Sequence, residues 1–237
     1  MSDLKAFAVG NLNIDLIGKI GELPSPDEKA LIKEFARRPG GGAANFAVAI
    51  SRLGLSSGFI GHVGDDDFGK EILEDLENKG VDSSQVTIVD ESTGIAFILT
   101  SSDRGRFLIE YRGANKYLSP NDLVDDYLEG GDVIHASSVN PEMALAIGSK
   151  AKELGLKASL DLGAELTHLS RPKLLELLNN FDICFMNEET FESIFNIQPT
   201  ELNVLRVLPE DLEVLSVTLG AEGAIAANED EAVSSSS

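Results

Sequence analysis

Residues 132–162 read DVIHASSVNPEMALAIGSKAKELGLKASLDL, and this stretch decides the fold class. It opens with a short apolar run at 132–136, continues with a helical pattern over 141–154 and ends with a second apolar run at 157–162. Short apolar runs bounded by turn residues predict buried strands, and the longer segment between them predicts a helix. A strand, a helix and a strand in this order form a βαβ unit, whose two strands lie parallel in one sheet.

The same alternation continues on both sides of this unit. Downstream we predict, in order, a helix over 172–179, a strand over 182–186, a helix over 188–196 and a strand over 214–219. Upstream we predict strands over 6–10 and 57–63 that alternate with helices over 43–53 and 68–79. The pattern indicates an α/β fold with a mostly parallel sheet between helices, and such sheets bind ligands beyond the carboxyl ends of their strands.

Three segments do not fit this core, because their polar and apolar residues alternate as in half-exposed strands. They cover 11–18, 93–101 and 106–112, and the turn Asp103-Arg104-Gly105 joins the last two into a predicted hairpin. We expect strands within 12–38 and 93–112 to form a separate small sheet that projects from the core.

The composition narrows the classes of function. The chain has 40 acidic and 19 basic residues, a formal charge of −21, which argues against a nucleic-acid or anionic membrane surface. An anionic substrate would have to be attracted by local dipoles, a metal or a few arginines. The N-terminus has no signal-peptide pattern and no segment is apolar for the length of a membrane span, so we expect a cytoplasmic protein. The single Cys184 lies in an apolar run and is predicted to be a buried small hydrophobe.

The last ten residues differ from the rest of the chain. Residues 228–237 are acidic and then all serine after Val233, so we expect a disordered tail after a single domain over 1–227.

The run Gly40-Gly41-Gly42-Ala43-Ala44-Asn45 precedes a predicted helix and is the first candidate site. Glycine lets the backbone approach a ligand closely, and a helix N-terminus favours an anion or a polyhydroxyl ligand. Asn13 and Asp15 share one face of a predicted strand, where a carboxylate beside an amide can hold two sugar hydroxyls. Taken alone, this pair is more typical of an ordinary solvated face.

Other polar residues follow predicted strands. We interpret the aspartates of Gly64-Asp65-Asp66-Asp67 mainly as caps of the following helix. The acidic pair in Asn187-Glu188-Glu189 also favours a helix N-terminus, and Thr218-Leu219-Gly220-Ala221-Glu222-Gly223 alone is a routine turn. His62, His135 and His168 lack metal-ligand spacing, and no P-loop or dinucleotide fingerprint is present.

Each of these signals is weak alone, but their order along the chain is specific. In that order the chain resembles the ribokinase family, also called the pfkB family of carbohydrate and nucleoside kinases. The resemblance runs from about Phe7 to Ala227 and rests on six motifs: Asn13-Ile14-Asp15, Gly40-Gly41-Gly42-Ala43-Ala44-Asn45, Val63-Gly64-Asp65-Asp66-Asp67-Phe68-Gly69, Arg112-Gly113-Ala114-Asn115, Asn187-Glu188-Glu189 and Thr218-Leu219-Gly220-Ala221-Glu222-Gly223-Ala224.

The resemblance implies a three-layer α/β/α domain with a small β-sheet lid over the acceptor. It implies transfer of the γ-phosphate of ATP, with Mg²⁺, to a hydroxymethyl group of a sugar, sugar acid or nucleoside. The residues that would hold the acceptor are Asn13, Asp15, Gly41, Gly42 and Asn45. Those that would lie along the nucleotide are Asn187, Thr218, Gly220 and Gly223, with Glu188 or Glu189 acting on Mg²⁺ through the phosphates. Pairing of lids implies a homodimer.

The chain departs from the family's pattern in several places. Gly42 and Ala43 replace the lysine and glycine of a ribokinase acceptor loop, Thr190 stands where the family has glutamate, and 161–165 departs from the Asp-x-Asn-x-Arg pattern. The motif Gly-Ala-Gly-Asp, which supplies the family's catalytic base, is not among the 237 residues. We therefore expect the C-terminal part of the usual fold, with the catalytic aspartate, to lie beyond the chain end. The alternative is a catalytically inactive member that binds a sugar or nucleoside.

Overall fold

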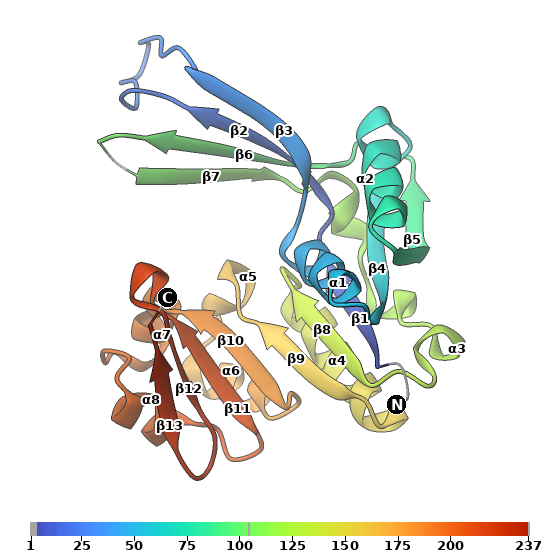
Figure 1. The fold of residues 1–237 in the computed structure, drawn as a ribbon, viewed down its shortest axis with the longest axis vertical. Helices are drawn as coiled ribbons and strands as arrows, with labels where there is room; N and C mark the ends of the chain where they lie inside the picture. Colours follow the sequence, from blue (N-terminus) through green and yellow to red (C-terminus); the bar gives the residue numbers. More distant parts are fainter. Residues whose placement is uncertain (1–3, 104, 237) are drawn as a thin grey trace.

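A nine-stranded sheet forms the centre of the computed structural model, which describes residues 4–103 and 105–236 (Figure 1). The strand order is β13-β12-β11-β10-β9-β8-β1-β4-β5, in which neighbours from β11 to β5 pair in parallel and β12 and β13 pair antiparallel. The strands are β1 (Lys5–Gly10), β4 (Ser56–Gly64), β5 (Val81–Val89), β8 (Val133–Ser137), β9 (Lys157–Asp161), β10 (Ile183–Asn187), β11 (Val214–Thr218), β12 (Ala224–Ala227) and β13 (Ala232–Ser235).

Helices cover both faces of this sheet, so the predicted α/β fold is confirmed. On one face lie α1 (Gly42–Arg52) and α2 (Asp67–Asn78), and on the other lie α4 (Pro141–Leu154), α6 (Arg171–Leu178), α7 (Glu188–Phe195) and α8 (Glu201–Val207). Shorter pieces are α3 (Asp125–Leu128), α5 (Ala164–Thr167) and the 3₁₀ turns η1 (Gly113–Tyr117), η2 (Pro120–Asp122) and η3 (Gly220–Glu222).

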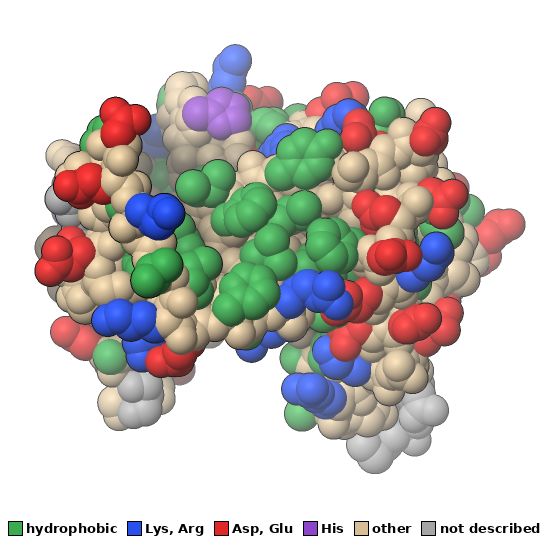
Figure 2. All heavy atoms as spheres, turned by 90° about the horizontal axis from the view of Figure 1, so that it is seen from above, with side chains coloured by type: hydrophobic (Ala, Val, Ile, Leu, Met, Phe, Trp, Pro, Cys, Tyr) green, Lys and Arg blue, Asp and Glu red, His purple; other side chains and the backbone are tan. Residues whose placement is uncertain are grey.

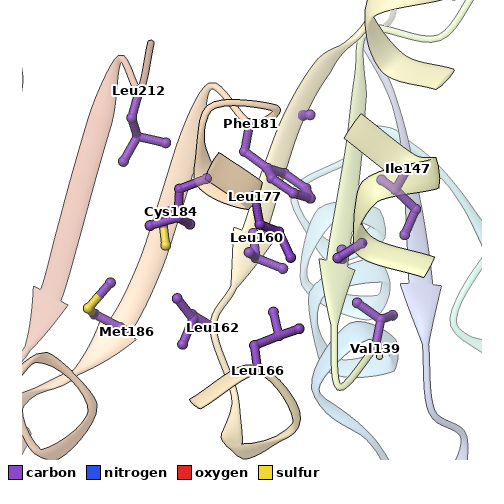
Figure 3. Packing of buried hydrophobic residues seen from close by; sticks show 14 of the residues in the cluster. Val139, Ile147, Leu160, Leu162, Leu166, Leu177, Phe181, Cys184, Met186 and Leu212 are labelled. Carbon is purple, nitrogen blue, oxygen red and sulfur yellow. The ribbon is translucent and has the colours of Figure 1, made fainter. Parts of the chain in front are cut away.

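Each helical layer has its own apolar cluster against the sheet. Figure 3 shows part of the larger cluster, where Cys184 of β10 lies near Leu160 of β9 and Leu177 of α6. Cys184 is fully buried, and its burial raises the pKa of the thiol. The predicted role of Cys184 as a small core hydrophobe is confirmed. No helix in the described part of the chain is both long and apolar enough to cross a membrane.

A second sheet of four strands projects from the core beside α1 and α2 (Figure 1). Its order is β3-β2-β6-β7, formed by β2 (Asn13–Lys19), β3 (Glu34–Gly40), β6 (Gly94–Ser101) and β7 (Gly105–Tyr111). Strands β6 and β7 pair antiparallel, which confirms the predicted hairpin, although Arg104 of its turn lies outside the described residues. We call this sheet the lid.

The prediction of a disordered tail is wrong for Ala232–Ser235, which form β13 and pair with β12. Asn228 turns the chain back, because its side chain accepts hydrogen bonds from the backbone N–H groups of Asp230 (3.0 Å) and Glu231 (2.9 Å). Pairing uses backbone groups, which serine carries like any other residue. The ends of the expected domain and tail, residues 1–3 and 237, lie outside the described residues.

Candidate functional site

The glycine run connects the lid to α1, and Gly41 at its centre has a backbone that excludes other residues. Its φ of 119° lies in the region that favours glycine, and a methyl group at this position would overlap the carbonyl oxygen of Asn11. Gly41 is also the N-cap residue of α1 and gives that helix no side-chain cap. The first N–H groups of α1 therefore have no capping side chain of their own.

The glycines on either side contact two polar side chains of other strands. A methyl group at Gly40 would overlap the carboxylate of Asp15 on β2, and one at Gly42 would overlap the hydroxyl of Ser137 on β8. The absence of side chains thus lets the run pack against the protein itself. This packing is a reason for the glycines in addition to the close ligand approach that the sequence suggested.

Asn13 is held in place by a residue to which sequence reasoning gave no role. The side-chain amide of Asn115 donates to the side-chain oxygen of Asn13 (2.8 Å) and to the carbonyl of Leu12 (3.0 Å), and its oxygen accepts from the N–H of Leu12 (2.8 Å). Asn115 and Asn13 are both buried. The one available signal was the position of Asn115 in Arg112-Gly113-Ala114-Asn115, which was recognised as a motif without a function.

Two carboxylates share the face of the lid that carries Asn13. Asp15 on β2 and Glu110 on β7 both pair with Ala96 of β6, so their side chains point to the same side. Burial raises the pKa of both carboxyl groups. The positive charge of Arg38 partly opposes the rise in the pKa of Asp15. The negative charge of Glu165 adds to the rise in the pKa of Glu110. The amide of Asn13 donates to Glu110 (3.3 Å). Carboxylates can accept hydrogen bonds from vicinal hydroxyls, and an amide beside them can donate to the hydroxyl oxygens.

Asp66 anchors this part of the chain from the other side. It caps α2 by accepting from the N–H of Gly69 (2.8 Å), which confirms the predicted cap. It also accepts from the N–H (2.8 Å) and the hydroxyl (2.6 Å) of Thr93, just before β6. Burial disfavours the charged form of Asp66, but these hydrogen bonds outweigh it and lower the pKa. The cap thereby ties the base of the lid to α2.

A cavity of about 460 Å³ lies beyond the carboxyl ends of β9, β10 and β11, where a parallel sheet binds its ligands. Its walls include Asp161, Gly163, Asn187, Glu189, Thr190 and Thr218. The structure therefore brings Asn187 and Thr218 together with Glu189, as the resemblance implied. Asn187 also caps α7, because its side-chain oxygen accepts from the N–H of Thr190 (2.7 Å).

Three of the expected residues do not line this cavity. Glu188 stands in the first turn of α7, and Gly220 opens the turn after β11. At Gly223 a methyl group would overlap the carbonyl oxygen of Ser235, because β13 runs alongside. The glycine at 223 is thus explained by close packing against the last strand.

Asp161 links the two halves of the site. Its carboxylate accepts a hydrogen bond from the hydroxyl of Ser137 (3.1 Å), the same hydroxyl that lies against Gly42. It lines the cavity at the strand ends, and burial raises its pKa although the bond from Ser137 opposes the shift. In the sequence Asp161 stood out only as part of an imperfect motif.

The carboxylates in this cavity also bear on the metal that the resemblance implies. No group of three or more potential ligand side chains stands together among residues 4–103 and 105–236. Mg²⁺ commonly uses one or two carboxylates together with substrate phosphates and water. Asp161 and Glu189 could supply these one or two carboxylates, because both line the same cavity.

The profile of the family described as pfkB family carbohydrate kinase matches residues 3–236. The chain belongs to the pfkB family of carbohydrate kinases. A nucleoside kinase of Methanothermobacter thermautotrophicus is 32% identical to this pfkB protein over 229 residues, which cover 96% of this chain and 74% of the relative. An ATP-dependent ribose-1-phosphate kinase of Halopiger xanaduensis is 31% identical over 192 residues, 81% of this chain and 64% of the relative.

The structural similarity of this pfkB protein covers nearly its full length. The crystal structure of the nucleoside kinase of Methanocaldococcus jannaschii, an archaeal member of the ribokinase family, superimposes with a TM-score of 0.80 at 28% identity. The match covers 97% of this chain and 75% of that structure. The predicted family and fold are both confirmed.

Proposed function

We propose that this protein transfers the γ-phosphoryl group of ATP to a hydroxymethyl group of a sugar, sugar acid or nucleoside. The observation that carries the proposal is the contact at Gly42: the acceptor residues at the lid base and the cavity at the strand ends adjoin through Ser137 and Asp161. A donor and an acceptor bound in these two places would face each other, and phosphoryl transfer depends mostly on such positioning.

The acceptor would lie between the lid and α1. Asp15, fixed by its place on β2, would accept hydrogen bonds from ring hydroxyls, and Asn13 would be kept in register by Asn115. Gly41, Gly42 and Asn45 would present backbone groups and an amide from the start of α1. The lid sheet would exclude water from above.

The nucleotide would lie along the ends of β10 and β11. Asn187 and Thr218 offer polar groups there, and the N-terminus of α7 favours negative charge. We assign Gly220 and Gly223 to the neighbouring turn, where they would border the nucleotide. Mg²⁺, held by the phosphates with Asp161 or Glu189, would neutralise charge on the transferring group. The bond from the γ-phosphorus to the β,γ-bridging oxygen of ATP breaks, and that oxygen leaves on the β-phosphate of ADP. A bond from the γ-phosphorus to the acceptor oxygen forms, and the hydroxyl proton leaves to a carboxylate or to water.

A coupled assay of ADP release tests this function, with a full-length protein that carries the Gly-Ala-Gly-Asp motif absent from these 237 residues. The panel contains pentoses, hexoses, 2-keto-3-deoxy sugar acids and nucleosides, each with Mg²⁺ and ATP. Turnover with any member supports the proposal. Stabilisation of the protein against heat by a sugar, without ADP release from any acceptor, would instead favour an inactive ligand-binding protein.

We also propose that the lid pairs with the lid of a second copy. On the face opposite Asp15, strand pairing aligns four apolar side chains, and Phe35, Phe97, Ile109 and Tyr111 are 63%, 42%, 61% and 45% exposed. Figure 2 shows hydrophobic side chains gathered over this sheet. A two-fold axis would set the same surface of each copy against the other and cover both.

A further inference from the structure

A second cavity, of about 640 Å³, opens beside the acceptor residues and lies between the lid and the α1 side of the core. Its lining includes Asp15 and Asn45, two of the residues to which we assign the acceptor. The volume lies within the range of small-molecule sites. The cavity is therefore an extension of the acceptor site, and the chemistry of its lining bears on what the acceptor carries.

Three basic side chains line this cavity, and one of them, Arg38, is the cross-strand partner of Asp15. Arg38 on β3, Arg52 at the end of α1 and Lys79 after α2 all line it. The chain as a whole is negatively charged, with 40 acidic and 19 basic residues, whereas three basic residues line this one cavity. Since the overall field repels anions, an anionic ligand would depend on such a local group of cations.

Among the described residues, the two arginines that line this cavity carry no ion pair of their own. In the part of the chain that the structure describes, neither Arg38 nor Arg52 takes part in an ion pair with an acidic side chain within 4.0 Å. Lys79, by contrast, is paired with Asp75 (2.6 Å). Arg38 acts on Asp15 only through its field. The guanidinium groups are thus available to a ligand, and a guanidinium fork suits carboxylate and phosphate oxygens.

The spacing along α1 separates the two ends of the cavity. Asn45, Val48, Ala49 and Arg52 line it at helical intervals, so they form one stripe of the helix. Seven residues at 1.5 Å each place Arg52 about 10 Å along the helix from Asn45. The carboxylate of Asp15 would repel an anion beside it, and Arg52 lies at the end of the stripe away from the Asn45 end.

We propose that the preferred acceptor carries an anionic group, a phosphate or a carboxylate, at the end opposite the hydroxymethyl group, and that Arg52 and Arg38 bind it. The proposal rests on the proposed function for the identity of the acceptor site. A sugar 1-phosphate and a sugar acid both have the required chemistry. Lys79 is already paired with Asp75, so it would contribute positive charge near the anionic group without contacting it.

Isothermal titration of the full chain tests the proposal without requiring turnover. The neutral ligands are ribose and a ribonucleoside, and the anionic ligands are ribose 1-phosphate and 2-keto-3-deoxygluconate. We expect at least one anionic ligand to bind ten or more times as tightly as either neutral one, with an affinity that falls as salt rises. Binding of ribose 1-phosphate alone would identify a phosphate subsite, and binding of the sugar acid alone a carboxylate subsite.

Variants locate the subsite. Arg52→Gln is expected to weaken the anionic ligand tenfold or more and to leave neutral ligands unchanged, and Arg38→Gln is expected to act in the same direction. The matched control is Arg37→Gln, because Arg37 points to the opposite face of the lid and pairs with Glu71 (2.8 Å). Equal affinity for anionic and neutral ligands, or an unchanged anionic affinity in Arg52→Gln, would overturn the proposal.

The ADP-release assay separates this inference from the proposed function. Tight anionic binding that depends on Arg52, with no ADP release from the full-length protein, would sustain the subsite and count against the kinase. Turnover of neutral acceptors that is unaffected by Arg52→Gln would sustain the kinase and count against the subsite. Absence of binding by all four ligands would count against the subsite, and the ADP-release panel would then decide on the kinase.

Discussion

The hydroxyl of Ser137 donates a hydrogen bond to the carboxylate of Asp161 over 3.1 Å, across the neighbouring strands β8 and β9. Ser137 is 2% exposed and lies against Gly42, whereas Asp161 reaches the cavity at the strand ends. One hydrogen bond therefore joins the start of α1 to the cavity that we assign to the nucleotide.

Replacing Asp161 with asparagine should weaken binding of the magnesium nucleotide at least about tenfold, because a contact to a charged group is worth about 1.5–3 kcal/mol. The free energy of unfolding should not fall in this variant. Burial raises the pKa of this carboxyl in the folded state, so its charged form opposes folding at neutral pH and asparagine removes that charge. Titration with Mg²⁺-ATP and urea unfolding at pH 7 measure the two effects.

Ser137→Ala is the matched control for that variant. It removes the partner of Asp161 and keeps the carboxylate, so the nucleotide affinity should fall much less than in Asp161→Asn. Equal losses in both variants would mean that Asp161 acts by fixing the strand ends and not by contacting the ligand.

Gly41→Ala should lower the free energy of unfolding by at least about 3 kcal/mol, since the residue would be both strained at a φ of 119° and pressed against the carbonyl of Asn11. Gly130→Ala is the comparison, because Gly130 has a φ of 74° with no atom within 4 Å of the added methyl group. It should lose only about 1–2 kcal/mol. Urea unfolding of both variants measures the difference, and equal losses would show that the contact with Asn11 relaxes freely.

The parts of the fold that depend on local pattern could be predicted from the sequence. Periodicity placed α4 and its flanking strands, and Asp66 was recognised as a cap because its partner Gly69 is three residues away. Strand β5 was missed because its half-exposed residues mix polar and apolar types with little periodicity. Strand β13 was missed because its pairing uses backbone groups that composition does not report.

The candidate site was predictable only where a motif marked it. The link between Asn13 and Asn115 spans 102 positions, and no local pattern reports such a distance. The same holds for the second cavity, whose lining includes both Arg38 of β3 and Arg52 of α1, 14 positions apart in the chain. Each arginine alone was an ordinary surface residue in the sequence.

Asp15→Asn should show opposite effects on stability and on acceptor binding. The pKa of Asp15 is raised in the folded protein by burial, which outweighs Arg38 and Arg106. Its charged form therefore opposes folding above the ordinary carboxyl pKa, and this penalty disappears as the pH falls and both states become protonated. At pH 7 the variant should unfold at a higher urea concentration than the parent, and the difference should vanish in acid.

Acceptor affinity should move the other way in Asp15→Asn, because the carboxylate that accepts from the hydroxyls is lost. In the parent protein, affinity should also fall on acidification, and it should begin to fall above the ordinary pKa of an aspartate. Titrations of both proteins between about pH 4, near the ordinary pKa of aspartate, and about pH 7 measure this. A pH-independent affinity in the parent protein would exclude Asp15 from the acceptor site.

The apolar face of the lid offers a prediction about assembly. Ile109→Lys should convert a dimer into a monomer, because it places a charge in the centre of the surface that also holds Phe97. Leu108→Lys is the matched control: Leu108 is 54% exposed on the adjacent position of β7 but points to the opposite face. Light scattering during gel filtration gives the mass of each.

A parent protein that is monomeric at all concentrations, or a control that dissociates as readily as Ile109→Lys, would contradict pairing through this face. A dimer that survives Ile109→Lys would place the interface elsewhere on the molecule.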